Sequence, residues 1–372
     1  MKVTHVDFIQ GIIEPAGIAL NGNNPWDIKV GDKRFYRRVT REGSIGLGES
    51  YMDCWWECDK LDDFFCRLMP SEPEKELPVN FNVIRSLIGS VILNPGRRSK
   101  AFDIGKHHYD TGNFLFSHML DRRMAYSCAY WKDAENLDEA QEDKLDLICR
   151  KLGVYDGDRI LDIGCGWGSF ARYAAEEYGT EVVGITVSKE QMSFAQELSQ
   201  GFPIEIRLQD YREVNETFDH IVSVGMFEHV GYKNHRAFMQ MVHRCLNDDG
   251  LFLLHTIGSN ISQVSGDPWM SKYIFPNSLI PSVRQIAASI EGLFVVEDWH
   301  NIGFYYDPTL MSWFDNFDRN WPVLRERYDE KFYRMWKYYL LSCAGLFRAR
   351  YMQVWQIVLS KKGVMGGYHP IR

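Results

Sequence analysis

The chain has 372 residues, a formal net charge of −8 and 45% hydrophobic residues. This length favours two domains, and the composition excludes an extensively disordered chain. The acidic balance argues against nucleic acid as a partner. No apolar run reaches the roughly 18 residues that a membrane-spanning helix needs, and the N-terminus lacks the apolar core of a signal peptide. We therefore expect a cytoplasmic protein.

The cysteines and aromatic residues narrow the chemistry further. The eight cysteines are scattered and none forms a C-x-x-C pair, so we predict reduced thiols and no metal site. The chain is rich in aromatic residues, including 11 Trp. They favour either a bulky core or an apolar pocket, and composition leaves both open.

Residues 1–80 are predicted to form a smaller N-terminal domain. An Asn21-Gly22 turn signal and a glycine-spaced run over 43–51 precede an aromatic cluster at 55–65. Residues 70–80 combine three prolines with several charges, which is typical of a domain boundary.

Residues 81–106 are predicted to be a linker that contains an amphipathic segment. Residues 81–93 have helical apolar spacing, and Arg97, Arg98 and Lys100 follow. A basic amphipathic segment can lie on an anionic membrane surface. An interdomain helix with solvated ends fits the same pattern, so both interpretations stay open here.

From about residue 155, short apolar runs alternate with helical segments. Strands are predicted at 159–163, 181–185, 204–208, 220–224, 251–256, 294–299 and 354–360, and helices at 169–178, 190–198 and 236–246. This alternation predicts an α/β fold with a parallel sheet that helices cover on both faces. The aromatic, helical stretch 310–346 is expected to cap the ligand-binding edge of that sheet.

The clearest motif is the glycine turn Leu161-Asp-Ile-Gly-Cys-Gly-Trp-Gly168. Glycines permit positive φ and close approach of a ligand to the backbone, and open α/β sheets bind ligands at the carboxyl ends of their strands. The spacing G-x-G-x-G differs from the dinucleotide fingerprint G-x-G-x-x-G. Asp162 could hold an ammonium group through a charge-assisted hydrogen bond. A plain strand–helix turn with a capping Asp is the alternative.

Three polar residues follow in the order expected for a nucleotide-like ligand. Thr186 stands at the end of the second strand, where many nucleotide-binding folds have an acid. Gln191 lies five residues later, and Asp210 follows the third strand, where it could meet an adenine amino group. Each residue alone could equally be a surface cap or turn residue.

The sequence resembles the cyclopropane fatty acid synthases. The resemblance is carried, in the family's order, by HHYDTGNFLF (107–116), YSCAYW (126–131), LDIGCGWG (161–168), IVSVGMFEHVG (221–231) and LLHTIG (253–258). Residues 46–65, GLGESYMDCWWECDKLDDFF, resemble the N-terminal domain of the longer bacterial members. This resemblance implies that the domain over residues 1–80 is associated with lipid or membrane. The resemblance implies a Rossmann-like class I methyltransferase fold in which a mostly parallel seven-stranded sheet carries a helical cap. It implies a catalytic domain over 107–372.

The resemblance also implies the activity and the cofactor. The family transfers a methylene group from S-adenosylmethionine to the cis double bond of an unsaturated phospholipid acyl chain, which forms a cyclopropane ring. Cofactor contacts are implied at Tyr126, Ser127, Gly164, Cys165, Gly166, Trp167, Gly168, Thr186, Gln191, Gln209 and Asp210, besides Asp162. Aromatic faces could stabilise the carbocation that forms on the lipid, and Tyr109, Tyr126, Trp131 and Tyr306 are candidates.

In this family the base that removes the final proton is a bound bicarbonate. The resemblance places its contacts at Cys128, Glu228, His255, the Ile257 backbone and Tyr306. Each side chain has a structural alternative, such as a helix-start carboxylate for Glu228 or a small buried hydrophobe for Cys128. Cys343 offers a rival mechanism through a thiolate, but burial in its apolar helix would make it inert.

Other activities compete with this interpretation. The nearest is a related lipid C-methyltransferase that yields a methyl or methylene-branched product. A nicotinamide-dependent dehydrogenase and a non-catalytic lipid-binding protein fit the sequence less well, because the dinucleotide fingerprint is missing and the site positions are retained. The resemblance implies a homodimer that associates peripherally with the inner face of the membrane.

Overall fold

The computed structural model describes residues 4–69 and 112–372. These residues form two compact units. The helical unit contains residues 4–69, 264–276 and 306–352, and the sheet unit contains residues 112–263, 277–305 and 353–372. The predicted boundaries at 80 and 106, and the predicted helix over 81–93, lie outside the described residues. The three-part domain division therefore stays a prediction.

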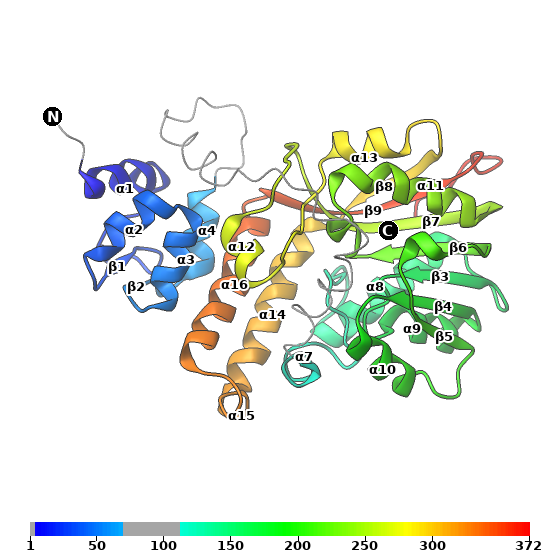
Figure 1. The fold of residues 1–372 in the computed structure, drawn as a ribbon, viewed down its shortest axis with the longest axis horizontal. Coiled ribbons are helices and arrows are strands. Elements are labelled where there is room, and N and C mark those ends of the chain that lie inside the picture. The colour runs from blue at the N-terminus through cyan, green and yellow to red at the C-terminus, as the bar shows by residue number, and fades with distance from the viewer. Residues whose placement is uncertain (1–3, 70–111) are drawn as a thin grey trace. The chain divides into compact units, whose positions relative to one another are not determined.

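A seven-stranded sheet forms the centre of the sheet unit (Figure 1). Its strands, in the spatial order β5-β4-β3-β6-β7-β9-β8, are Ile204–Leu208, Glu181–Thr186, Arg159–Ile163, Phe218–Val224, Leu246–Ser259, Met352–Ser360 and Val295–Asn301. The pairs β5–β4, β4–β3, β3–β6 and β6–β7 are parallel, whereas β8 and β9 are antiparallel. This mostly parallel sheet confirms the predicted α/β fold class.

Helices cover both faces of this sheet because successive side chains of a strand point to opposite sides. Ile160 packs in a cluster with α8 (Leu137–Leu152) and α9 (Ser169–Tyr178). The next residue, Leu161, packs in a cluster with α11 (His235–Cys245) and α13 (Val283–Ile290). Figure 1 shows these two pairs of helices on opposite sides of the sheet. The continuous apolar runs of the sequence thus correspond to strands buried on both faces.

Strand β7 is longer than its apolar run predicts. It begins at Leu246, whereas the sequence pattern predicts a start at Leu251 and a helix that continues to Leu246. The extra residues include Asn247 and Asp248, which are polar and exposed, and Asn247 donates to Asp219 Oδ1 at 2.8 Å. The apolar pattern does not predict this start of β7, because strand residues that face solvent need not be apolar.

The helical unit combines N-terminal helices with a late segment of the chain. It contains α1 (His5–Ile13), α2 (Arg34–Glu42), α3 (Ser44–Met52), α4 (Leu61–Leu68), α12 (Pro268–Tyr273), α14 (Tyr306–Arg319), α15 (Trp321–Leu324) and α16 (Glu330–Arg348), with a ribbon of β1 (Lys29–Val30) and β2 (Trp56–Glu57). The helical character predicted for 310–346 is confirmed. Its role as a cap over the sheet stays a prediction.

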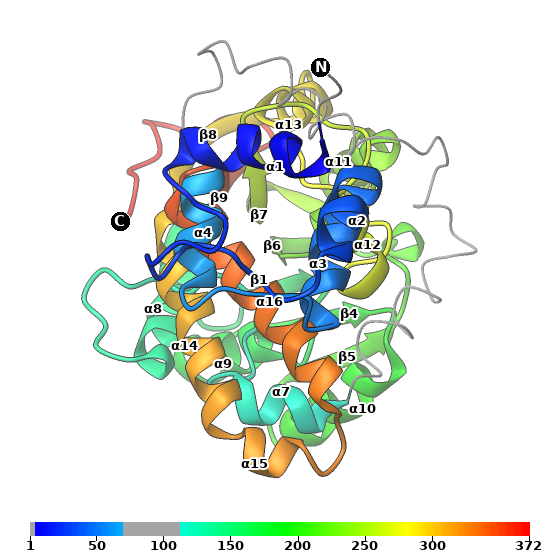
Figure 2. The ribbon, with the colours of Figure 1, turned by 90° about the vertical axis from the view of Figure 1, so that its left-hand side faces the viewer.

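Helix α16 is the centre of the helical unit, where it packs against α3, α4 and α14 (Figure 2). Gly345 allows the closest approach, since a Cβ there would lie 2.3 Å from the Asp62 carbonyl oxygen. Arg348 joins three elements through ion pairs with Asp62, Asp63 and Asp307. Because the N-terminal helices and 306–348 share this core, they are packed as one unit. No helix of residues 4–69 and 112–372 is long and apolar enough to cross a membrane.

We predict that Gly258→Ala destabilises the sheet unit by about 1–3 kcal/mol or more, because strand β9 closely approaches β7 at this glycine. A Cβ on Gly258 would lie 2.1 Å from the Trp355 ring. Urea unfolding followed by circular dichroism measures the loss. In the double variant Gly258→Ala/Trp355→Leu the clash is removed, so its loss should be smaller than the sum of the single losses. Strictly additive losses would contradict this account.

Candidate functional site

The glycine turn joins β3 to α9 and opens a cavity at the carboxyl end of the strand. Gly164, Gly166 and Gly168 all have positive φ, at 83°, 55° and 79°. The Gly164 and Cys165 amides donate to the Ile185 carbonyl of β4 at 2.9 and 3.0 Å. A Cβ on Gly164 would lie 2.7 Å from the Met226 side chain. The turn therefore requires glycine at Gly164 for both its backbone angle and its lack of a side chain.

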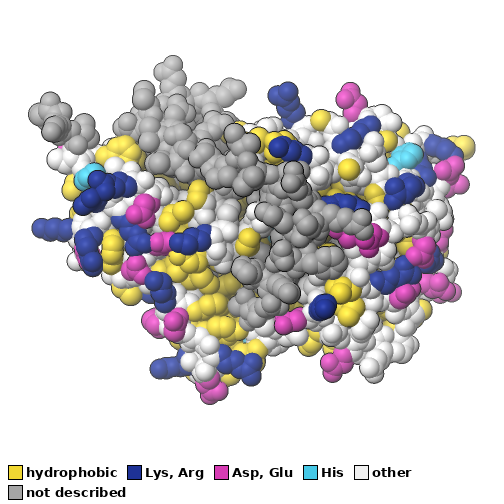
Figure 3. Space-filling model, in the orientation of Figure 1, with side chains coloured by type: hydrophobic (Ala, Val, Ile, Leu, Met, Phe, Trp, Pro, Cys, Tyr) yellow, Lys and Arg dark blue, Asp and Glu magenta, His cyan; other side chains and the backbone are white. Residues whose placement is uncertain are grey.

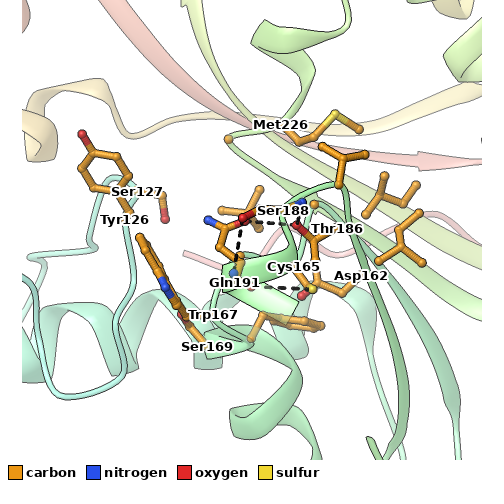
Figure 4. Close-up of a pocket in the computed structure, with 18 of the residues that line it drawn as sticks. Tyr126, Ser127, Asp162, Cys165, Trp167, Ser169, Thr186, Ser188, Gln191 and Met226 are labelled. Atoms are coloured by element: carbon orange, nitrogen blue, oxygen red, sulfur yellow. Dashed lines mark hydrogen bonds between the residues drawn. The ribbon is translucent and has the colours of Figure 1, made fainter. Parts of the chain in front are cut away.

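The cavity has a volume of about 200 Å³. Figure 4 shows Tyr126, Ser127 and Trp167 on one side of it and Asp162, Cys165 and Thr186 on the other. The cavity thus brings together nearly all the predicted cofactor contacts. They are Tyr126, Ser127, Asp162, Gly164, Cys165, Gly166, Trp167, Thr186, Gln191, Gln209 and Asp210; Gly168, in the same turn, does not line the cavity.

Asp162 is the buried acid of this cavity. It is 2% exposed, and burial raises the pKa of its carboxyl to about 7, while the charge of Lys144 opposes that rise. A carboxylate held in such surroundings is stabilised when a cation binds beside it. The structure therefore supplies a reason for a cationic ligand that the sequence motif alone could not provide.

Aromatic side chains form the side of the cavity that contains Tyr126 and Ser127. Phe116 of α7 (Asn113–Met119) lies with its ring centroid 4.9 Å from both Tyr126 and Trp167. Trp167 Nε1 donates to Asn113 Oδ1 at 2.9 Å. These contacts join the HHYDTGNFLF and YSCAYW segments to the glycine turn.

Thr186 and Gln191 form a hydrogen-bonded pair at the end of β4. Thr186 Oγ1 lies 3.1 Å from Gln191 Oε1 and 3.2 Å from the Ser188 amide. The amide oxygen can only accept, so the Thr186 hydroxyl donates to it, and the Gln191 side-chain NH₂ is left to donate to a ligand. Ser188 caps α10 (Lys189–Leu198) by accepting from the Gln191 amide. An uncharged pair thus stands where other folds place an acid.

Asp210 follows β5 and is also buried. Its Oδ1 accepts from the Arg212 amide at 2.9 Å and its Oδ2 from Arg212 Nη1 at 3.4 Å. Asp210 thereby caps the short helix Tyr211–Glu213 as well as lining the cavity. The predicted cap role and the predicted ligand role are therefore compatible.

A second polar group lies where β6 and β7 end. Glu228, in the turn Phe227–His229, accepts from the Ile257 amide through Oε1 at 2.6 Å. Its other oxygen, Oε2, is buried and has no hydrogen-bond partner. Burial raises the pKa of the Glu228 carboxyl to about 7, and the bond from Ile257 opposes the rise. The Ile257 amide, predicted to bind the anion, here holds Glu228 instead.

His255 and Cys128 lie in the same unit. His255 pairs with Val224 across β6 and β7, and its Nδ1 lies 3.4 Å from Gln356 Nε2. Burial, with Lys144 and Lys151 nearby, lowers the pKa of His255 well below its ordinary value, so the ring is neutral. The buried Cys128 Sγ lies 3.3 Å from the Ala129 carbonyl oxygen and 3.8 Å from that of Ile302.

Tyr306 and Cys343 belong to the helical unit. The Tyr306 ring is buried, with centroids 4.6 Å from Phe347 and 5.8 Å from Trp313. Burial raises the pKa of the Cys343 thiol to about 12, so it is protonated at neutral pH. This favours the inert alternative for Cys343 over a thiolate mechanism. The roles of both residues stay predictions.

Sequence reasoning missed several residues that line the cavity, among them Met124, Lys144, Ser188, Arg212, Met226 and His229. For Lys144 a signal existed. Ala140, Lys144 and Ile148 are spaced by four residues, which places this lysine on the apolar stripe of α8. A lysine is almost never fully buried unless it is paired, so this position could have been singled out from the sequence.

The comparisons with known proteins agree with this geometry. Residues 97–357 match the family model described as mycolic acid cyclopropane synthetase. The chain belongs to the cyclopropane fatty acid synthase family. It is 53% identical over 361 residues to the cyclopropane-fatty-acyl-phospholipid synthase of Escherichia coli K12, a match that covers 97% of this chain and 94% of the relative. The predicted family and the predicted class of S-adenosylmethionine-dependent methyltransferase are confirmed.

Two further relatives extend the comparison. The mycolic acid cyclopropane synthase CmaA1, solved in complex with SAH and CTAB, is 33% identical with a TM-score of 0.65, over 70% of this chain and 98% of that one. The sphingolipid C9-methyltransferase of Komagataella phaffii is 33% identical over 298 residues, which covers 74% of this chain and 60% of the relative. The first of these supports the class I methyltransferase fold.

Proposed function

We propose that the protein transfers a methylene group from S-adenosylmethionine to the cis double bond of an unsaturated phospholipid acyl chain, and so forms a cyclopropane ring. One observation carries the proposal: a cavity with a buried carboxylate for a cationic cofactor shares its strand edge with a buried, half-satisfied carboxylate at Glu228. The similarity over 97% of the chain to a cyclopropane-fatty-acyl-phospholipid synthase supports the lipid substrate.

The cavity residues fit S-adenosylmethionine. Asp162 would hold the ammonium group of its amino-acid end, and the glycine turn would let the ligand approach its backbone closely. The Gln191 NH₂ and Thr186 would meet the ribose, and Asp210 the adenine amino group. The cofactor supplies an electrophilic methyl group on a sulfonium. These residues bind and orient it, which can contribute about 7–11 kcal/mol when an alkene must be held in line.

The Glu228 site fits a small proton-bearing anion such as bicarbonate, which supplies a base for the last proton transfer. Glu228 Oε2 is a buried acceptor without a partner, so it can receive the hydrogen bond of a bicarbonate O–H. Oε1 is held by the Ile257 amide, which fixes the direction of the carboxylate. Neutral His255 can donate or accept through its ring. Cys128, in the same unit, belongs to the set that the family resemblance implies, whereas the part of Tyr306, in the helical unit, stays a prediction.

A bilayer lipid must also reach the enzyme. Helix α2 carries exposed Arg34, Arg37 and Arg41, with Lys33 before its first residue. Figure 3 shows basic side chains gathered on this end of the helical unit, with some acidic ones among them. Such a helix supports peripheral binding to an anionic membrane surface. The predicted basic segment with Arg97, Arg98 and Lys100 lies outside the described residues. A homodimer remains part of the proposal through the family alone.

A lipid C-methyltransferase is the second candidate. Its specific support is the similarity to the sphingolipid C9-methyltransferase. The two activities share the methyl transfer and differ in which proton is lost from the carbocation. A base placed beside the added methyl favours ring closure, whereas loss of a proton elsewhere leaves a branched alkene. We propose that an anion bound at the Glu228 site acts as such a base, which would give the first outcome.

The product decides between the two. The purified protein is incubated with methyl-labelled S-adenosylmethionine and vesicles of unsaturated phospholipid, and the released acyl chains are analysed by mass spectrometry. The proposal predicts a chain that is heavier by one labelled CH₂ group and takes up no hydrogen under conditions that reduce an alkene. A labelled chain that still takes up hydrogen would identify the methyl or methylene product. No label in lipid, with cofactor binding intact, would overturn the proposed function.

We predict that Glu228→Gln lowers kcat at least a hundredfold. The glutamine side chain has one oxygen, which the Ile257 amide would hold, and its NH₂ group would stand where the O–H of the anion needs an acceptor. Its Kd for S-adenosylmethionine should change less than threefold, since Glu228 does not line the cofactor cavity. The exposed Glu291→Gln serves as the matched control and should leave both values unchanged. Full activity of Glu228→Gln would remove this residue from the mechanism.

We predict that S-adenosylmethionine binds more weakly as the pH falls, because the ligand's ammonium requires ionised Asp162. Since burial places the pKa of Asp162 at about 7, its ionised fraction falls about eightfold between pH 7.5 and pH 6, and Kd should rise accordingly. Isothermal titration at the two pH values measures this. Asp162→Asn should bind weakly at both and lose the pH dependence. Equal Kd values for the wild type would contradict the role of Asp162.

A further inference from the structure

We propose that Lys144 is a positioning residue, which holds the Ser127 hydroxyl as a hydrogen-bond donor toward the carboxylate of the cofactor's amino-acid end. The inference rests on the proposed cofactor and deepens it. It assigns a recognition site for the α-carboxylate, as distinct from the ammonium that Asp162 would bind.

Lys144 carries a buried positive charge. Lys144 is 1% exposed and lies on the buried stripe of α8, one turn after the fully buried Gln141. Burying an ammonium is costly unless hydrogen bonds and opposite charges compensate it. Two carboxylates, Asp121 and Asp162, provide that compensation through their charge. A simple core position would be filled at lower cost by an apolar residue of the same length.

The hydrogen bond between Lys144 and Ser127 has a defined direction. Lys144 Nζ lies 3.0 Å from Ser127 Oγ. An ammonium can only donate, so the serine oxygen must accept, and its own proton is left to donate elsewhere. Ser127 and Lys144 both line the cofactor cavity, and Figure 4 shows Ser127 facing it beside Tyr126. The serine is thereby fixed as a donor, which suits a ligand carboxylate.

Hydrogen bonds anchor the segment that carries Ser127. Gln141 Nε2 donates to the carbonyl oxygens of Ala125 and Ser127 at 3.2 and 2.9 Å. Asp121 Oδ1 accepts from the Ala125 amide at 2.8 Å, and Ser169 Oγ donates to the Met124 carbonyl at 3.1 Å. The segment is therefore held from both α8 and α9, and the Ser127 hydroxyl has a defined place.

The charges of the cavity complement those of an α-amino acid. The same cavity is lined by a buried carboxylate, Asp162, and a buried ammonium, Lys144. An α-amino acid zwitterion offers the opposite pair, with its ammonium toward Asp162 and its carboxylate toward the Ser127 hydroxyl. This arrangement explains why one cavity buries two opposite charges without a direct ion pair between them at hydrogen-bond distance.

The experiment compares three ligands that differ at the amino-acid end. S-adenosylmethionine carries both groups, decarboxylated S-adenosylmethionine lacks the carboxylate, and 5′-methylthioadenosine lacks both. Lys144→Met should weaken S-adenosylmethionine binding at least tenfold more than it weakens binding of the other two, because the effect of the lost Lys144 charge on Asp162 is shared by decarboxylated S-adenosylmethionine. Isothermal titration gives the constants, and a thermal melt verifies that each variant is folded. If the wild type binds none of the three, the proposed function fails rather than this inference.

A matched control exists on the same helix. Lys151 is also buried on α8, but its Nζ lies 3.0 Å from His300 Nδ1 and 3.5 Å from Asp298, and it does not line the cavity. Lys151→Met should leave all three affinities unchanged. Should Lys144→Met not fold, Ser127→Ala is measured with the same ligands and carries the same expectation. Equal weakening of all three ligands, or no weakening of S-adenosylmethionine, overturns the proposal.

Discussion

The parallel pairing of β3 with its two neighbours is the constraint on which the site depends. Parallel strands end at the same edge of a sheet, so groups that follow different strands are brought together there. Asp162 lies on β3, Thr186 ends β4, and Glu228 follows β6. The register β6–β7 pairs Val224 with His255 and thereby aligns Ile257 with the turn that carries Glu228. One hydrogen-bonding pattern thus assembles residues that are almost a hundred positions apart.

The glycine turn turns this edge into a cavity. Because Gly164 and Cys165 donate their amides to β4, the backbone of the turn stays close to the sheet. Met226 approaches Gly164 so closely that any side chain there would collide with it. The wall opposite is built by aromatic contacts among Phe116, Tyr126 and Trp167. Local backbone freedom and non-local packing are both required for the space that a cofactor would occupy.

Burial of charge is the energetic cost of this design. The pKa values of Asp162 and Glu228 are both raised to about 7, and the pKa of Lys144 is lowered to about 8, with burial as the main cause in each case. Such groups destabilise the folded chain relative to apolar residues of the same size. Clusters of shifted pKa values are typical of functional sites, where ligand charge restores the balance. The helical unit shows a different case, since Arg348 forms ion pairs with three carboxylates.

The sequence by itself determined the approximate extent of the strands, the glycine turn and eleven of the residues that line the cavity. Apolar runs and glycine spacing are local properties, and the family motifs name residues one at a time. Only the tertiary structure decided that the Ile257 amide holds Glu228, that Lys144 donates to Ser127, and that residues 306–348 pack with the N-terminal helices. These contacts join positions from 17 to nearly 300 residues apart, and no local pattern specifies the partner of a buried polar group. The pairing of strands and the packing of helices specify it.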